Sequence, residues 1–154
     1  MKRKIVLFIA TAGGFGYSPL ASGTAGTAVA LPFAYMLLHL PIVWQAAVLV
    51  LSYVVFSWAA GEADTMFGKH DPGQIVCDEV IGYWVTLFAL PPDAAHLGLG
   101  FLLFRFFDIV KPFPAGTVDK KVGGGQGVML DDVIAGIYAN ICVRLILSYG
   151  VFIS

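Results

Sequence analysis

A long uncharged apolar segment, residues 42–60, restricts the folds open to this chain more than any other feature of its sequence. Among its nineteen residues only Gln45, Ser52 and Ser57 are clearly polar. As an α-helix the segment would extend about 28 Å, which matches the thickness of the hydrocarbon core of a bilayer. The sequence therefore predicts that this segment spans a membrane.

Shorter or interrupted apolar runs surround this segment, and prolines separate them. The runs cover residues 28–40, 80–90, 97–107 and 133–153. Pro41 and the pair Pro91-Pro92 disfavour helix between paired runs, so each is predicted to mark the tip of a helical hairpin. The chain would then return twice to the side from which it started.

Such hairpins would bring three polar stretches, residues 13–27, 61–79 and 105–132, to one face of the protein. That face would carry every carboxylate except Asp93, and every lysine and arginine except Arg144. Because basic residues favour the cytoplasmic side of a membrane, we expect this face to be cytoplasmic.

The composition agrees with a membrane protein. Hydrophobic residues make up 58% of the chain and charged residues 12%, with a mean hydropathy of +0.84, which is more apolar than a usual soluble chain. We predict one domain, residues 1–154, with an all-α fold: a membrane-embedded bundle of helical hairpins with a polar catalytic cap on the cytoplasmic face. The alternative is a soluble helical protein with an unusually apolar core, because short apolar runs are often buried core helices.

Three general features bear on compartment and partners. The basic start, Lys2-Arg3-Lys4, imitates a secretory signal peptide, but the apolar core after it is short, and a cytoplasmic basic anchor is the prediction. A net charge of −1, without a basic patch containing aromatic residues, argues against a nucleic-acid partner. Cys77 and Cys142 have no CxxC or framework spacing, which fits a reducing compartment or a membrane interior.

Two adjacent acidic pairs lie at the edges of apolar runs. They are Asp78-Glu79 and Asp131-Asp132. Carboxylates at an apolar boundary are costly to desolvate unless they are paired, bound to metal or catalytic, so the two pairs predict a divalent-cation site. The alternative is helix capping, which does not require two acids at each place. Asp108 and Asp119 are possible additional ligands.

Two basic residues near these acids predict an anion site. Arg105 offers a planar fork to two phosphate oxygens, and Lys111 offers a point charge, so together they could clamp a phosphate. The alternative is that Arg105 simply pairs with Asp108, three residues later on a helix. A cation beside an anion at a bilayer surface indicates phosphate chemistry on a lipid.

Two glycine-rich stretches could approach a phosphate through their backbones. We predict a substrate-binding loop at residues 123–127, and a second stretch at residues 23–27 that leads into a helix beginning near Ala28. The candidate substrate-binding residues are Thr24, Thr27, Gly124, Gly125 and Gly127. The alternatives are plain flexible turns and N-capping threonines.

His70, beside Asp71, could supply a proton to the leaving alkoxide, or the two could be a surface pair.

The sequence lacks the motifs of several other phosphatases and lipid-headgroup transferases. Neither cysteine has an arginine six positions later, and the chain contains no Asp-x-Asp and no DGxxAR pattern.

Taken in order, these motifs resemble one family. The sequence reads SPLASGTAGT, IVCDEVIG, FRFFDIVKPFP, GGGQG and MLDDVIAG. From about Gly13 to Gly136 it is similar to the phosphatidylglycerophosphatase A family. One departure is Ser22, where the family pattern usually has proline.

The resemblance implies a bacterial inner-membrane enzyme that uses Mg²⁺ to remove the terminal phosphate of phosphatidylglycerol phosphate, a phospholipid substrate. Metal would then be held by Asp78, Glu79, Asp131 and Asp132, and Arg105, Asp108 and Lys111 would be catalytic. To these catalytic residues we add His70, which is predicted from its position before the first acidic pair and not from the resemblance. In-line attack by water is expected, with a covalent carboxyl-phosphate as the alternative.

Two other functions remain open. One is another lipid-headgroup phosphatase. The other is a small polytopic cation transporter, in which we would expect carboxylates within the spans, whereas here they cluster at the ends beside arginine and lysine.

Overall fold

The fold is all-helical, as the computed structural model shows for residues 1–68 and 72–150, with the side chains at positions 119, 120, 149 and 150 left undescribed. This part of the chain forms seven α-helices and one short 3₁₀ helix, and contains no strand. The elements are α1 (Lys2–Ala10), η1 (Phe15–Tyr17), α2 (Ser22–Leu38), α3 (Ile42–Phe67), α4 (Cys77–Leu87), α5 (Ala94–Val110), α6 (Ala115–Lys121) and α7 (Gly124–Gly150). The all-α prediction is confirmed.

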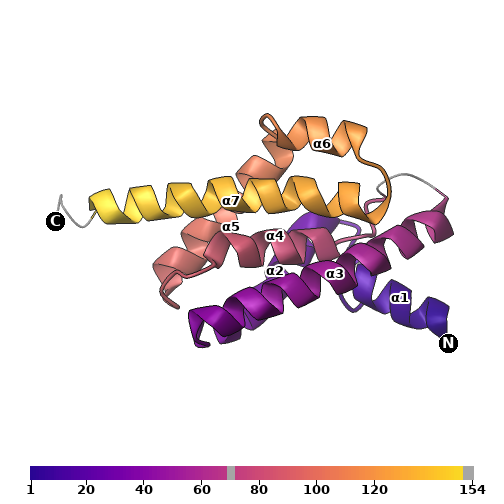
Figure 1. The fold of residues 1–154 in the computed structure, drawn as a ribbon, viewed down its shortest axis with the longest axis horizontal. Coiled ribbons are helices and arrows are strands. Elements are labelled where there is room, and N and C mark those ends of the chain that lie inside the picture. The colour runs from indigo at the N-terminus through magenta and orange to yellow at the C-terminus, as the bar shows by residue number, and fades with distance from the viewer. Residues whose placement is uncertain (69–71, 151–154) are drawn as a thin grey trace.

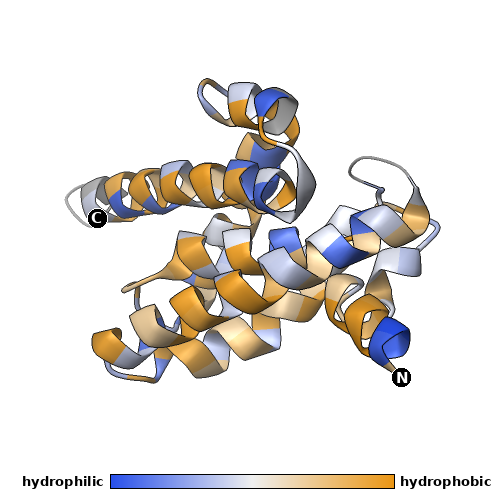
Figure 2. Cartoon of the chain, turned by 45° about the vertical axis from the view of Figure 1, so that its right-hand side comes forward, coloured by the Kyte–Doolittle hydropathy of each residue, from blue (hydrophilic) through white to orange (hydrophobic). Residues whose placement is uncertain are grey.

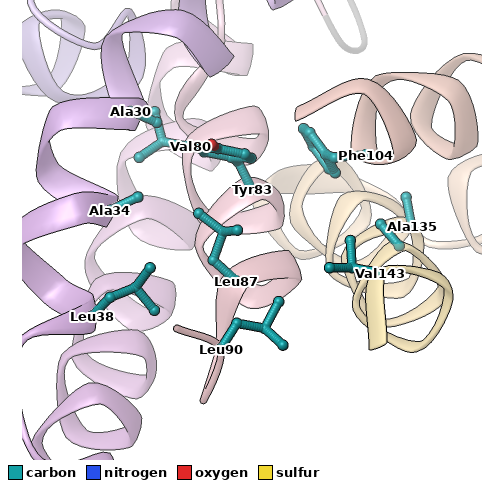
Figure 3. Packing of buried hydrophobic residues seen from close by; sticks show 11 residues of the cluster. Ala30, Ala34, Leu38, Val80, Tyr83, Leu87, Leu90, Phe104, Ala135 and Val143 are labelled. Atoms are coloured by element: carbon teal, nitrogen blue, oxygen red, sulfur yellow. The ribbon is translucent and has the colours of Figure 1, made fainter. Parts of the chain in front are cut away.

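The short helix α4 is the centre of the bundle. It packs against α2, α3, α5 and α7 (Figure 1). Its buried residues Val80, Tyr83 and Leu87 recur at helical spacing and therefore share one face. Figure 3 shows this face between the small residues of α2, such as Ala30, and Phe104 of α5. The burial of each large side chain contributes roughly 1.5–3 kcal/mol, so this layer fixes how α4 sits in the bundle.

A second cluster joins α1 to the C-terminal half of α3. Val6 and Ala10 of α1 are fully buried against Ala59 and Ala63 of α3. The N–H of Val76 donates to the carbonyl oxygen of Ala10 at 2.9 Å, which ties the segment before α4 to the end of α1. The predicted N-terminal basic segment therefore forms a packed helix.

Polar residues inside the apolar runs tie two turns together at the end of the bundle where α2 and α4 finish (Figure 1). Gln45 accepts a hydrogen bond from the N–H of Ala89 at 3.1 Å and donates to the carbonyl oxygen of Leu40 at 2.9 Å. Arg144 donates to the carbonyl oxygens of Phe88 and Ala89. Arg144 therefore caps the end of α4, a role that the sequence did not indicate.

Two helices begin earlier than predicted. α2 starts at Ser22 rather than near Ala28, and α7 starts at Gly124, so the predicted glycine loops are helical first turns. The prediction was wrong because close packing overrides the poor helix propensity of glycine. A Cβ atom at Gly26 would lie 2.7 Å from Val76, and one at Gly125 would lie 1.9 Å from the carbonyl oxygen of Ser57.

The earlier start of α7 also moves the second acidic pair. The prediction placed Asp131 and Asp132 at the beginning of a helix, whereas they lie two turns inside α7. Capping of that helix is therefore excluded as their role.

One described helix, α3, is long and apolar enough to cross a membrane, and only 11% of its apolar window is buried within the protein. Figure 2 shows hydrophobic residues along most of the length of the helices, with hydrophilic residues gathered near the N-terminus and where α5, α6 and α7 meet. Membrane embedding stays a prediction.

Candidate active site

Three carboxylates from two helices form a compact group. Asp78 and Glu79 lie in the first turn of α4, and Asp132 lies on α7. Each offers one oxygen to a set in which all atoms lie within 4.8 Å of one another. The structure thus brings together three of the four predicted metal ligands.

Two glycines bring these helices close enough for the group to form. A Cβ atom at Gly136 of α7 would lie 2.4 Å from the carbonyl oxygen of Gly82 on α4, and one at Gly82 would lie 2.8 Å from the carbonyl oxygen of Asp132. Gly82 and Gly136 each follow a site carboxylate by four residues, which is about one helical turn. The backbone contact between the helices therefore sets Asp132 beside Asp78.

Burial and mutual repulsion make the three acids weak in the metal-free protein. Burial raises the pKa of Asp78, and Glu79 and Asp132 raise it further. Burial is also the main cause that raises the pKa of Glu79 from its ordinary 4.5 to about 7, against the lowering effects of Asp78 and Arg105. For Asp132, burial and the neighbouring Asp108 and Glu79 raise the pKa.

The group fits a hard divalent cation. Asp78 Oδ1, Glu79 Oε2 and Asp132 Oδ2 are buried carboxylate oxygens without a hydrogen-bond partner. Leaving such atoms unsatisfied is costly, and carboxylate oxygens are the ligands that Mg²⁺ prefers. A bound cation would satisfy all three.

Asp131, the fourth predicted ligand, is not among these three. Its Oδ2 accepts from Lys111 Nζ at 2.5 Å, and Lys111 occupies the C-terminal cap of α5. Consecutive helical residues point about 100° apart, so Asp131 and Asp132 meet different neighbours. Lys111 is therefore paired with the carboxylate that directly precedes Asp132 in α7, and its place in a phosphate clamp with Arg105 stays a prediction.

Arg105 lies against the acidic group itself. Its Nη1 is 2.5 Å from Asp108 Oδ2 and 3.8 Å from Glu79 Oε1. The alternative that the sequence left open, pairing of Arg105 with Asp108, is thus present together with a contact to the metal candidates. Its Nε is buried without a partner, so the guanidinium retains donor capacity.

The N-terminus of α2 covers the Glu79–Arg105 pair. A Cβ atom at Gly23 would lie 2.3 Å from Glu79 Oε1 and 2.9 Å from Arg105 Nη1. First-turn N–H groups of a helix have no acceptor within the helix and favour an anion. Gly23 therefore lets an anion-binding helix end reach the acidic group and the arginine.

The remaining predicted residues fall in several places. Thr24 is exposed one residue after Gly23, whereas Thr27 is buried and its hydroxyl donates to the carbonyl oxygen of Gly23 at 2.9 Å. Gly125 and Gly127 pack against Ser57 and Val122. Gly124 adopts a positive φ of 69° at the start of α7. His70, and the side chain of Asp119, lie outside the described residues.

Sequence reasoning missed the positional roles of Gly23, Gly82 and Gly136. A signal for two of them was available. Both acidic motifs read Asp followed four residues later by Gly, a spacing that puts a small residue on the carboxylate's own helix face.

Comparison with known proteins supports one family. The family model described as phosphatidylglycerophosphatase A matches residues 8–147. The phosphatidylglycerophosphatase A of Escherichia coli strain K12 is 41% identical over 127 residues, covering 80% of this chain and 73% of that protein. The Haemophilus influenzae protein of the same name is 51% identical over 77 residues, covering 49% of this chain and 47% of that protein.

A third relative bears another name. A Bacteroides thetaiotaomicron protein named "Putative phosphatidylinositol-3-phosphatase" is 37% identical over 155 residues, covering 94% of this chain and 96% of that protein. No solved structure matches. The family model covers nearly the whole helical bundle, including every residue of the acidic group, and the chain therefore belongs to the phosphatidylglycerophosphatase A family.

Proposed function

We propose that this protein is a Mg²⁺-dependent phosphatidylglycerophosphatase, which hydrolyses the terminal phosphomonoester of phosphatidylglycerol phosphate. The observation that carries the proposal is a group of three carboxylates, one of which, Glu79, lies 3.8 Å from Arg105, with Gly23 of α2 packed against both residues. This arrangement supports phosphoryl transfer, because carboxylates suited to a cation lie beside an arginine suited to an anion.

Mg²⁺ would be held by Asp78, Glu79 and Asp132, whose unsatisfied oxygens supply the hard donors. When bound, the ion would neutralise charge on the phosphoryl group and lower the pKa of a water molecule. The close contact of Gly82 with Gly136 would keep α4 and α7 at the separation that lets the three carboxylates bind one ion.

The phosphoryl group would be bound by the chain's own donors. Arg105 presents a guanidinium next to Glu79, and Gly23 in the first turn of α2 packs against both. The first-turn N–H groups at Gly23 and Thr24 would supply further donors. Asp108 contacts Arg105 and would fix the orientation of the fork. These donors would stabilise the negative charge that spreads over the phosphoryl oxygens in the transition state.

The reaction consumes one water molecule. A water oxygen forms the new bond to phosphorus while the bond from phosphorus to the glycerol oxygen breaks in line with it. That glycerol oxygen takes up a proton, and the products are phosphatidylglycerol and inorganic phosphate.

The bundle would sit in the bacterial inner membrane. α3 has the length and hydropathy of a span, and its exposed residues include Val50, Leu51, Val54 and Trp58. The basic residues of α1 lie at the end of the bundle where α4 and α7 begin (Figure 1). By the positive-inside rule this end, with the site, would face the cytoplasm.

A second candidate substrate is phosphatidylinositol 3-phosphate. The Bacteroides thetaiotaomicron relative named for that activity aligns with nearly the full length of this chain. Both lipids present a phosphomonoester on a polyol headgroup, so the same site could act on either.

Phosphate release from purified protein tests the function. Both lipids are supplied in mixed micelles, with EDTA, with EDTA followed by excess Mg²⁺, and with the Asp78→Asn variant as control. We expect release from phosphatidylglycerol phosphate that EDTA abolishes and Mg²⁺ restores. Release only from phosphatidylinositol 3-phosphate would favour the second candidate, and release that survives EDTA would contradict the metal site.

A further inference from the structure

A second concave feature adjoins the proposed phosphate site. It is a polar pocket of about 390 Å³ whose lining includes Tyr17, Ser18, Ser22 and Gln74. Three of these side chains carry hydroxyl groups and the fourth carries an amide. None of the residues that line the pocket is charged.

Residues on both sides of this pocket are close in sequence to residues of the candidate active site. Ser22 is followed by Gly23, which lies against Glu79 and Arg105. On the other wall, Gln74 precedes Asp78 by four residues in the segment that enters α4. The pocket therefore lies beside the N-terminal ends of α2 and α4, where the phosphoryl group would bind.

The walls are held together by close backbone packing. A Cβ atom at Gly16 would lie 2.0 Å from the carbonyl oxygen of Gln74, so η1 is pressed against the segment before α4. The N–H of Val76 also donates to the carbonyl oxygen of Ala10. These contacts fix the position of η1 relative to the segment that carries Gln74.

We propose that this pocket binds the polyol that carries the scissile phosphate, which in phosphatidylglycerol phosphate is the leaving glycerol. Hydroxyl and amide groups pair well with a neutral polyol, because each can donate to or accept from an alcohol. A further phosphate would call for lysine or arginine, such as Lys111 and Lys121, which line a separate pocket beside α6. An acyl chain would call for an apolar lining, such as that of the groove between Phe8, Phe33 and Trp84.

This inference rests on the proposed function and assigns its headgroup specificity to Gln74 and Tyr17. Each would make a neutral hydrogen bond to the polyol. Loss of one such bond weakens binding of the polyol portion by about 3- to 10-fold. The phosphoryl group, held by Arg105 and the α2 terminus, would be bound as before.

Two inhibitors separate the polyol from the phosphate. Release of phosphate from phosphatidylglycerol phosphate is measured in the presence of glycerol 3-phosphate or inorganic phosphate, for wild type, Gln74→Ala and Tyr17→Phe. The matched control is Tyr35→Phe, which removes the hydroxyl of a similarly exposed tyrosine. Tyr35 lies in the C-terminal half of α2 and does not line the pocket.

We expect the inhibition constant of glycerol 3-phosphate to rise about 3- to 10-fold in both pocket variants, while that of inorganic phosphate stays within about twofold. Tyr35→Phe should change neither constant. If both constants rise together, or if neither changes in Tyr17→Phe, the pocket does not bind the polyol. Absence of phosphate release by the wild type would instead overturn the proposed function, and this inference with it.

Discussion

Gly82 and Gly136 hold α4 and α7 in direct backbone contact, because a Cβ atom at Gly136 would lie 2.4 Å from the carbonyl oxygen of Gly82. The contact involves a carbonyl group, which cannot rotate away as a side chain could. Any residue larger than glycine at position 136 must therefore push the two helices apart. Since Asp132 is one turn from this contact, the acidic group would open as well.

Gly136→Ala should therefore lose both activity and Mg²⁺ affinity, with destabilisation of about 1–3 kcal/mol from overpacking. Phosphate release over a range of Mg²⁺ concentrations measures the first two, and thermal unfolding measures the third. Gly98→Ala is the matched control: Gly98 is also helical, but a Cβ there meets nothing within 4 Å. That control should be neutral or slightly stabilising. Normal Mg²⁺ dependence in Gly136→Ala would show that the helix contact does not set the site.

The four predicted metal ligands should not behave alike. Asp78→Asn and Asp132→Asn should each abolish turnover, because the amide keeps the shape but loses the charge that Mg²⁺ requires. Asp131→Asn should retain Mg²⁺ dependence and lose activity less severely, since Asp131 contacts Lys111 and is not one of the three grouped acids. Asp93→Asn, at the opposite end of the bundle, is the control. If Asp131→Asn lost as much Mg²⁺ affinity as Asp78→Asn and Asp132→Asn, this result would show that Asp131 is also a ligand.

The convergence of two distant acidic motifs could be predicted from sequence, because hairpins between prolines bring alternate ends of apolar runs to one side. The choice between Asp131 and Asp132 could not. Neighbouring residues of a helix point about 100° apart, and the phase of α7 depends on where Gly136 meets Gly82. Only packing between helices decides which acid of the pair faces α4.

One of the two contacts of Arg105 could likewise be predicted from the sequence, and the other could not. Its contact with Asp108 follows from a local spacing of three residues on α5, whereas its contact with Glu79 joins two helices. The glycine-rich first turns of α2 and α7 were predicted as loops because the glycine backbone can adopt a positive φ and approach a phosphate closely. Packing of Gly26 against Val76 and of Gly125 against Ser57 stabilises the helical conformation of these turns. Such contacts join segments far apart in the sequence, so the local sequence does not reveal them.

Gly23→Ala should inactivate the protein while leaving its fold largely intact. The added Cβ would lie 2.3 Å from Glu79 Oε1 and would displace Glu79, Arg105 or the start of α2. We expect a fall in phosphate release of about tenfold or more, equivalent to at least 1.4 kcal/mol of lost transition-state stabilisation. Thermal unfolding of the same samples separates this effect from misfolding. Wild-type kinetics in Gly23→Ala would mean that the α2 terminus does not contact the reacting group.

Arg105→Lys should harm catalysis although the charge is retained. Lysine cannot present two parallel donors to phosphoryl oxygens, and it would not reproduce the contacts of the fork with Asp108 and Glu79. A clamp that acts on the transition state predicts that kcat and kcat/KM fall together, whereas a ground-state contact would mainly raise KM. If Arg105→Lys keeps both constants, Arg105 is only a structural partner of Asp108.

The metal-free protein should be more stable in mild acid than in mild base. The folded-state pKa values of Asp78, Glu79 and Asp132 are raised, that of Glu79 from 4.5 to about 7, so the folded chain binds more protons than the unfolded chain in this range. Stability from Glu79 is then fully present below about pH 4.5 and is lost as the pH rises through about 7.

Mg²⁺ should reverse this trend, because its ligands must be deprotonated and its binding stabilises only the folded state. Thermal unfolding in detergent at pH 5.5 and pH 8, with EDTA or with Mg²⁺, measures both effects. We expect the EDTA sample to melt higher at the lower pH and Mg²⁺ to raise the melting temperature mainly at the higher pH. The triple variant Asp78→Asn, Glu79→Gln, Asp132→Asn should lose both dependences. A melting temperature in EDTA that increases with pH would show that the three acids are not the groups whose burial opposes folding, and would remove the physical reason for a cation between them.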